Sequence, residues 1–123
     1  MPITRTLLAA ALGVVFLAPA SLFAETLAAN QAKHHIGEYH TVCGHVAEVK
    51  HLRKRVVMNM GQCYPNEDVY GLVWNDKADY VQSGVGLLDN LAGQQICITG
   101  VIKDYKGHAN IIISSPSELK VVK

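Results

Sequence analysis

Apolar and polar side chains alternate along segments 42–46 and 96–102 with the two-residue period of a half-buried β-strand. In the first segment the two valines share one face, whereas Cys43 lies on the other. In the second segment three isoleucines share a face, and Cys97 lies on its reverse. The pattern predicts two strands whose aliphatic faces line a core. Both thiols then lie on the outer face, where antiparallel neighbours can bring them together.

The same analysis of the rest of the chain predicts a strand-rich body with two short helices. A first helix at 30–36 ends at Gly37, and a second at 77–82 has Asp76 as its N-terminal cap. Gly44 predicts a bend or bulge within the first strand. The predicted strands are 39–51, 55–60, 69–74, 95–105 and 108–114, with turns at 52–54 and 106–107, a loop at 61–68, a capping box at 115–118 and a last extended piece at 119–122.

Five strands with a short helix between the third and the fourth is the element order of the OB-fold, an all-β Greek-key barrel. Short motifs also resemble those of small exported bacterial OB-fold proteins, a family described as nucleic-acid-binding-like. The resemblance covers about 37–122 and implies a five-stranded OB-fold barrel that acts as a noncatalytic binding module. The motifs are TVCGHV at 41–46, MNMG at 58–61, YPN at 64–66, ICITGVI at 96–102, DYKG at 104–107 and SPS at 115–117.

The N-terminal residues 1–24 have the pattern of a secretory signal peptide. Arg5 precedes an uncharged apolar run at 7–18 that is shorter than a membrane span, and small residues follow it. We expect cleavage after Ala24, with Ala20 as the alternative, and an uncleaved membrane anchor is the competing interpretation. The sequence therefore predicts a periplasmic or secreted protein with one OB-fold domain at 25–123.

The predicted domain has no net charge. Of the eleven Lys and Arg residues only Arg5 lies within 1–24, and all ten Asp and Glu residues follow that segment. The formal charge of 25–123 is therefore zero with neutral histidines, which argues against a general polyanion binder. A nucleic-acid partner would have to use a local basic patch.

Three cysteines in an exported chain allow one internal disulfide. We expect Cys43 to pair with Cys97, which would stabilise the domain by about 4 kcal/mol in the chain-entropy model. Two buried free thiols are the alternative. Cys63 would be left over, either free or paired between molecules, and the chain has no Cys-x-x-Cys motif.

The candidate binding residues follow from where OB-folds bind their ligands, across strands two and three and between the flanking hairpin loops. Basic residues cluster on the first hairpin and could contact phosphates, while aromatic side chains on the third strand could stack on bases. A solvated turn and aromatic core packing are the competing interpretations. The candidates are Lys50, Arg53, Lys54, Arg55, Asn59, Tyr70, Trp74, Tyr105, Lys106 and His108.

Two function classes follow. The first is binding of single-stranded DNA or RNA, or of another anionic oligomer, and the second is a protein-interaction module of the cell envelope, which the neutral charge favours. The chain has six histidines but no pair with the spacing of metal ligands, so we expect no metal and no cofactor. A nuclease needs clustered carboxylates and separated arginines, whereas Arg53 and Arg55 lie together, so we expect no enzyme activity.

Overall fold

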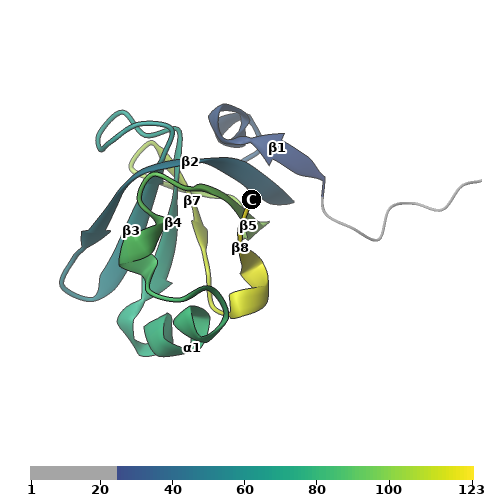
Figure 1. Ribbon diagram of the computed structural model, residues 1–123. Helices are drawn as coiled ribbons and strands as arrows, with labels where there is room; N and C mark the ends of the chain where they lie inside the picture. Colours follow the sequence, from purple (N-terminus) through teal and green to yellow (C-terminus); the bar gives the residue numbers. More distant parts are fainter. Residues whose placement is uncertain (1–24) are drawn as a thin grey trace, which may run out of the picture.

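The computed structural model describes residues 25–123, and the predicted signal peptide lies outside them. The chain forms a strongly curved sheet with helix α1 packed at one end (Figure 1). The elements are β1 (Thr26–Ala28), the 3-10 helix η3 (Ala29–His34), β2 (Tyr39–His51), β3 (Arg55–Met60), β4 (Val69–Trp74), α1 (Asn75–Val85), the 3-10 helix η4 (Leu88–Leu91), β5 (Gln95–Val101), β6 (Lys103–Tyr105), β7 (His108–Ile112), the 3-10 helix η5 (Pro116–Glu118) and β8 (Leu119–Val121).

The strands pair in the order β6-β7-β4-β3-β2-β5-β8, and β1 runs parallel to β2 outside this path. Most pairs are antiparallel, but β4 and β7 pair in parallel, with Tyr70 opposite Asn110. This arrangement confirms a strand-rich, OB-fold-like domain. The sheet of the described residues has eight strands and is not closed, so it does not show the closed five-stranded barrel that the sequence predicted.

Three predicted strands have the predicted bounds, β2, β3 and β4. The predicted strand 95–105 divides into β5 and β6 because Ile102 leaves the ladder between them. The Ile102 N–H donates to the carbonyl of Glu38, and its own carbonyl accepts from Gly37. Before this residue β5 pairs with β2, and after it β6 pairs with β7, so one continuous segment serves two parts of the curved sheet.

The N-terminal helix is a 3-10 helix that begins and ends earlier than predicted. Its residues Ala29 and Ala32 are buried against the sheet. A Cβ atom added at Gly44 would lie 2.8 Å from the Ala29 Cβ, so Gly44 provides space for the packing of η3. Of the bend or bulge predicted at Gly44, the bulge was wrong, because the register of β2 against β3 shifts between Val46 and Glu48 instead.

Helix α1 is longer than the predicted 77–82. It begins after Trp74, so Asp76 lies in the first turn and is not the cap. The helix continues through Gly84, where an added Cβ would lie only 2.4 Å from the Pro116 Cβ, and ends at Gly86, which has φ of 84°. The absence of a side chain at Gly84 therefore allows α1 to pack closely on Pro116, and Gly86 ends the helix.

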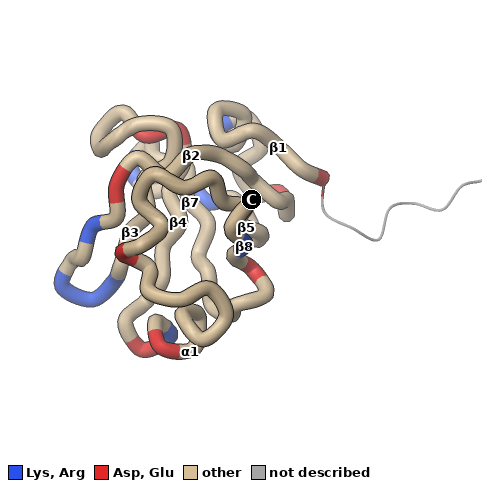
Figure 2. Tube along the Cα trace, in the orientation of Figure 1, with Lys and Arg blue, Asp and Glu red and all other residues tan. Residues whose placement is uncertain are grey.

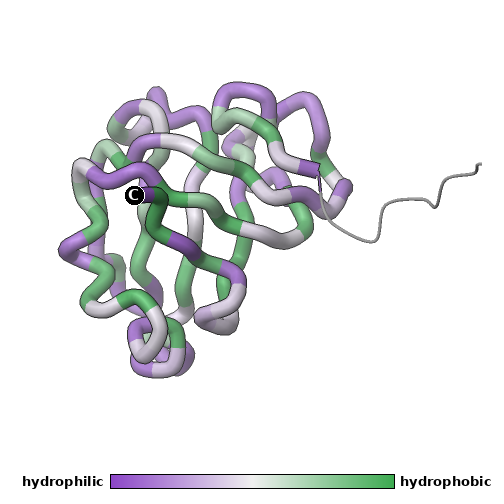
Figure 3. Tube along the Cα trace, turned by 45° about the vertical axis from the view of Figure 1, so that its right-hand side comes forward, coloured by the Kyte–Doolittle hydropathy of each residue, from purple (hydrophilic) through white to green (hydrophobic). Residues whose placement is uncertain are grey.

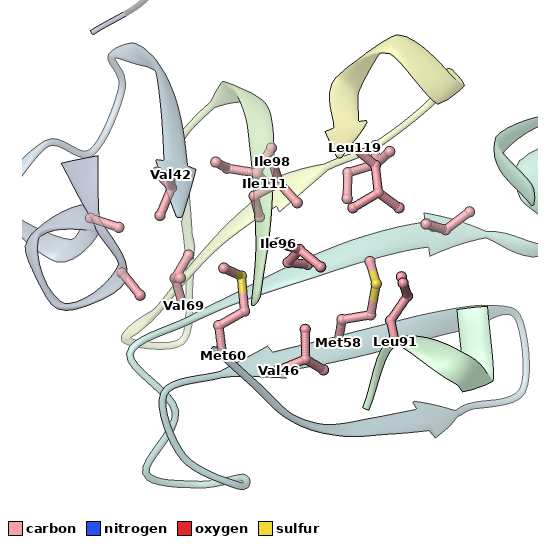
Figure 4. Packing of buried hydrophobic residues seen from close by; sticks show 14 of the residues in the cluster. Val42, Val46, Met58, Met60, Val69, Leu91, Ile96, Ile98, Ile111 and Leu119 are labelled. Carbon is pink, nitrogen blue, oxygen red and sulfur yellow. The ribbon is translucent and has the colours of Figure 1, made fainter. Parts of the chain in front are cut away.

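The hydrophobic core lies inside the curve of the sheet. Met58 and Met60 point inward from β3, toward isoleucines of β5 and β7 (Figure 4). Leu91 of η4, in the connection where the sequence predicted no element, packs against the same cluster. Full burial of a side chain of this size contributes about 1.5–3 kcal/mol. Hydrophobic colours run along the chain through the body of the molecule, and hydrophilic colours are most frequent in the surrounding loops (Figure 3).

Cys43 and Cys97 lie directly opposite each other on β2 and β5 and form the predicted disulfide, with their Cα atoms 4.0 Å apart. The alternative of two free thiols is wrong. The bond closes a loop with a sequence separation of 54. Cys63 is free and exposed. No helix within residues 25–123 is both long enough and apolar enough to cross a membrane.

Candidate binding groove

A groove of about 340 Å³ lies on the outer face of the β2–β3–β4 sheet, between the β2–β3 hairpin and the β6–β7 hairpin. The basic residues of the β2–β3 hairpin form the largest blue segment of the chain trace (Figure 2). Apolar side chains form part of the lining, and three permanent cations surround them. The lining residues are Lys50, Leu52, Arg55, Val57, Asn59, Tyr64, Tyr70, Tyr105, Lys106 and His108.

The floor of the groove is set by the alternation of β3. Because successive side chains of a strand point to opposite faces, Val57 and Asn59 face the groove while Met58 and Met60 enter the core. Across the ladder Asn59 is paired with Tyr70 of β4. One strand thus supplies both the core and the floor of the groove.

Asn59 is only 2 % exposed and is held by Glu48. Its Nδ2 donates to Glu48 Oε2 at 2.8 Å, and the backbone N–H of Tyr64 donates to the same oxygen at 2.8 Å. These two hydrogen bonds, the Tyr64 bond first, lower the pKa of Glu48 below its ordinary value. Among the described residues the buried Asn59 Oδ1 has no hydrogen-bond partner. The amide is therefore oriented by its donor end, and its oxygen is buried.

Tyr64 forms one wall of the groove. Its ring stacks on His108, and His108 Nδ1 is in turn hydrogen-bonded to Glu67 Oε2. The Glu67 side chain is only 1 % exposed, so this pair anchors the loop between β3 and β4 to the first residue of β7. Tyr64 itself is 62 % exposed, which leaves its outer ring face open to a ligand.

The opposite hairpin supplies Tyr105 and Lys106. Lys106 has φ of 52° and Gly107 has φ of 86°, the positive pair that a tight two-residue hairpin requires. The Lys106 Nζ lies 5.3 Å from the centroid of the Tyr105 ring. A cation over an aromatic face is favourable by about 0.5–1 kcal/mol at an exposed site, so the pair is held loosely and can exchange for a ligand.

A second depression of about 320 Å³ continues from the groove and shares Arg55, Tyr70 and Tyr105 with it. Trp74 lines this second depression, and the Arg55 guanidinium carbon lies 5.9 Å from the centroid of the Trp74 ring. Burial raises the pKa of Tyr70, so its phenol is neutral at physiological pH and is available as a hydrogen-bond donor. The two depressions are therefore neighbours, with Arg55, Tyr70 and Tyr105 at their common border.

Seven of the ten predicted residues line the groove: Lys50, Arg55, Asn59, Tyr70, Tyr105, Lys106 and His108. Trp74 lines the second depression. It also lines a third depression, to which Lys54 belongs. Arg53 lines none of these three. The carbonyls of Arg53 and Lys54 accept hydrogen bonds from Asn75, which anchors the turn of the hairpin against the start of α1.

Sequence analysis missed Tyr64, Leu52 and Val57 as lining residues. Val57 was within reach of prediction, because it shares the two-residue period of Arg55 and Asn59. Tyr64 was not, because its position depends on contacts with Glu48 and His108, which lie 16 and 44 positions away in the chain.

Comparison with known proteins places the fold and leaves the family open. No protein-family model matches the chain, and no curated protein sequence matches it. Solved structures match at low identity, and they support the OB-fold alone. An OBody, AM1L10, bound to hen egg-white lysozyme is 16 % identical with a TM-score of 0.58, over 88 % of this chain and 99 % of that one.

Two further structures have similar scores. A chain of the S. pombe Stn1-Ten1 complex is 14 % identical with a TM-score of 0.51, over 73 % of this chain and 67 % of that one. A putative aspartyl-tRNA synthetase from Leishmania major Friedlin is 5 % identical with a TM-score of 0.56, and the match covers 90 % of this chain but 23 % of that one. At these identities the likeness concerns architecture and not activity.

Proposed function

We propose that this chain is a noncatalytic OB-fold binding module that holds a single-stranded nucleic acid, or another extended anionic oligomer, across the groove. One observation carries the proposal: Lys50, Arg55 and Lys106 border the same groove as the exposed ring faces of Tyr64 and Tyr105. Cations contact phosphates, and aromatic faces stack on bases of any sequence.

The shape of the groove supports an extended ligand. Its volume of about 340 Å³ is at the lower end of the ~300–1,000 Å³ range of small-molecule sites. The second depression lengthens the path toward Trp74 and shares Arg55 with the first. A chain-like ligand can follow both depressions, whereas a compact one fills only the first.

Export belongs to the same proposal. The Cys43–Cys97 disulfide is of a kind that persists in oxidising compartments, and residues 1–24 have the pattern of a signal peptide. We therefore propose a periplasmic or secreted protein.

The test is fluorescence anisotropy of labelled single-stranded DNA and RNA titrated with the oxidised protein at low and near-physiological salt. Contacts with about three phosphates predict an affinity loss of about ten-fold for a three-fold rise in salt. The double variant Lys50→Glu, Arg55→Glu is expected to abolish binding. The matched control is Lys77→Glu, Lys120→Glu, which places the same charge change on exposed residues outside the groove. Absence of binding at low salt, or equal loss in the control, would contradict the proposal.

A protein ligand is the second candidate function, and two observations favour it. The domain 25–123 has no net charge, and Leu52 and Val57 give the groove an apolar part. An OBody structure similar to this chain is one bound to lysozyme, so this architecture is able to present a protein-binding surface. A protein contact made through apolar groups is insensitive to salt, which distinguishes it from phosphate contacts in the same titration series.

A further inference from the structure

Three potential metal ligands meet at the start of β2, away from the groove. They are His35 at the end of η3, Glu38 in the following turn, and His40 on β2, and one ligand atom from each lies within 4.8 Å of the others. We propose that His35, Glu38 and His40 form a binding site for a divalent late transition metal ion, Zn²⁺ or Cu²⁺. The site goes beyond the binding function proposed above and does not depend on it.

The distances suit a shared ion. His35 Nδ1 lies 2.9 Å from Glu38 Oε1, and His40 Nε2 lies 2.7 Å from the same oxygen. In a tetrahedral site with metal–ligand distances of about 2.0–2.1 Å, neighbouring ligand atoms are about 3.3 Å apart. The two nitrogen–oxygen distances therefore need to increase by only fractions of an ångström, which small rotations of the exposed Glu38 and half-exposed His35 side chains provide.

The backbone holds the ligands in place. Gly37, with φ of 89°, turns the chain between His35 and Glu38. Its N–H donates to the Ile102 carbonyl at 2.7 Å, and the Glu38 carbonyl accepts from the Ile102 N–H at 2.9 Å. His40 is only 7 % exposed and lies in the ladder opposite Gly100. One ligand is thus fixed in the sheet, and the other two are tied to it by a short anchored turn.

The donor set selects the class of metal. Two imidazole nitrogens and one carboxylate oxygen suit Zn²⁺ and Cu²⁺, whereas Mg²⁺ and Ca²⁺ require sites made of oxygen. Three protein ligands leave a coordination position open for water or another ligand. The His40 Nδ1 has no hydrogen-bond partner within the described residues. A ligating histidine normally has such a partner, so we expect an affinity below that of closed structural zinc sites.

The site is separate from the groove. His40 and Lys50 lie near opposite ends of β2, so they are separated by roughly 30 Å along a strand that rises about 3.3 Å per residue. Figure 1 shows η3 and the start of β2 at one side of the molecule and the β2–β3 hairpin at the other. A variant at one site is therefore not expected to disturb the other directly.

The test is isothermal titration calorimetry of the oxidised protein with Zn²⁺ and with Cu²⁺, and with Mg²⁺ as a negative control. A Cys63→Ser background removes the exposed thiol as a competing ligand. We expect one Zn²⁺ per chain. Glu38→Gln and His35→Ala should each weaken binding by at least ten-fold, because loss of an outer-shell partner alone typically costs about 10–100-fold. His34→Ala is the matched control, since His34 is exposed and adjacent but outside the cluster.

Thermal unfolding supplies a second readout, because an ion that binds only the folded protein raises Tm. Zn²⁺ should raise the Tm of the Cys63→Ser background and of His34→Ala by similar amounts, and should raise that of Glu38→Gln by less at the same Zn²⁺ concentration. Glu38 is an exposed surface residue, so this variant tests the site without removing a buried group. No stoichiometric binding, or undiminished binding by Glu38→Gln and His35→Ala, would overturn the proposal.

Discussion

The ring of Tyr64 stacks on the ring of His108, with centroids 5.4 Å apart and an angle of 23° between the planes. This contact joins the loop after β3 to the start of β7, two segments that do not pair in the sheet. It also turns a tyrosine from an exposed loop into a wall of the groove. Tyr64, which sequence analysis placed in a loop, is therefore a principal candidate for stacking on a ligand.

Replacing Tyr64 with alanine should weaken binding of single-stranded nucleic acid by about 5- to 150-fold, the loss of one stacking platform worth about 1–3 kcal/mol. The unfolding free energy should change little, because the ring is 62 % exposed. Anisotropy titration measures the first effect and denaturant unfolding the second. Tyr80→Ala is the control, since Tyr80 is similarly exposed on α1. Equal losses in both variants would contradict a role of Tyr64 in the groove.

The Cys43–Cys97 disulfide should contribute about 4 kcal/mol to the free energy of unfolding in the chain-entropy model. The double variant Cys43→Ser, Cys97→Ser should show this loss in urea denaturation. Cys63→Ser should leave the midpoint unchanged, because Cys63 is exposed and outside the bond. A double variant as stable as the parent would show that the sheet pairing alone determines stability.

Gly84→Ala should destabilise the domain by about 1–3 kcal/mol, the usual cost of overpacking. The added methyl group would lie 2.4 Å from the Pro116 Cβ, where α1 packs on η5. In an exposed helix the same change would instead be stabilising by up to about 1 kcal/mol. A lower urea midpoint for Gly84→Ala would therefore indicate the close contact with Pro116, and a higher midpoint would contradict it. Ser83→Ala, one position earlier on the exposed surface, is the control.

Glu48 should make the free energy of unfolding depend on pH in the acid range. Hydrogen bonds from the Tyr64 N–H and Asn59 hold its folded pKa below the ordinary 4.5, so its contribution is fully present above that value. The contribution is lost as pH falls through the lowered folded pKa. The Tm difference between the parent and Glu48→Gln should therefore be largest near neutral pH and shrink in acid.

A Tm difference between the parent and Glu48→Gln that stays constant from neutral to acid pH would contradict the assigned role of the carboxylate.

Much of the fold was predictable because it depends on short-range periodicity. Strands β2, β3 and β4 have the predicted bounds, since turn and loop residues delimit these short apolar segments. Alternation along 42–46 and 96–102 placed Cys43 and Cys97 on one outer face and so predicted their bond. The bounds of α1 were not predictable, because Gly84 stays helical through its contact with Pro116 in a distant segment.

The sequence by itself determined the strand-rich class, the disulfide and the set of basic and aromatic residues from which the groove is built. Only the tertiary structure decided that Tyr64 faces this groove while Arg53 does not, and that His35, Glu38 and His40 converge. The physical reason is that strand faces follow from a local two-residue period. The meeting of loop side chains instead depends on the turn at Gly37, the Glu48 hydrogen bonds and the packing of distant segments, which no local pattern encodes.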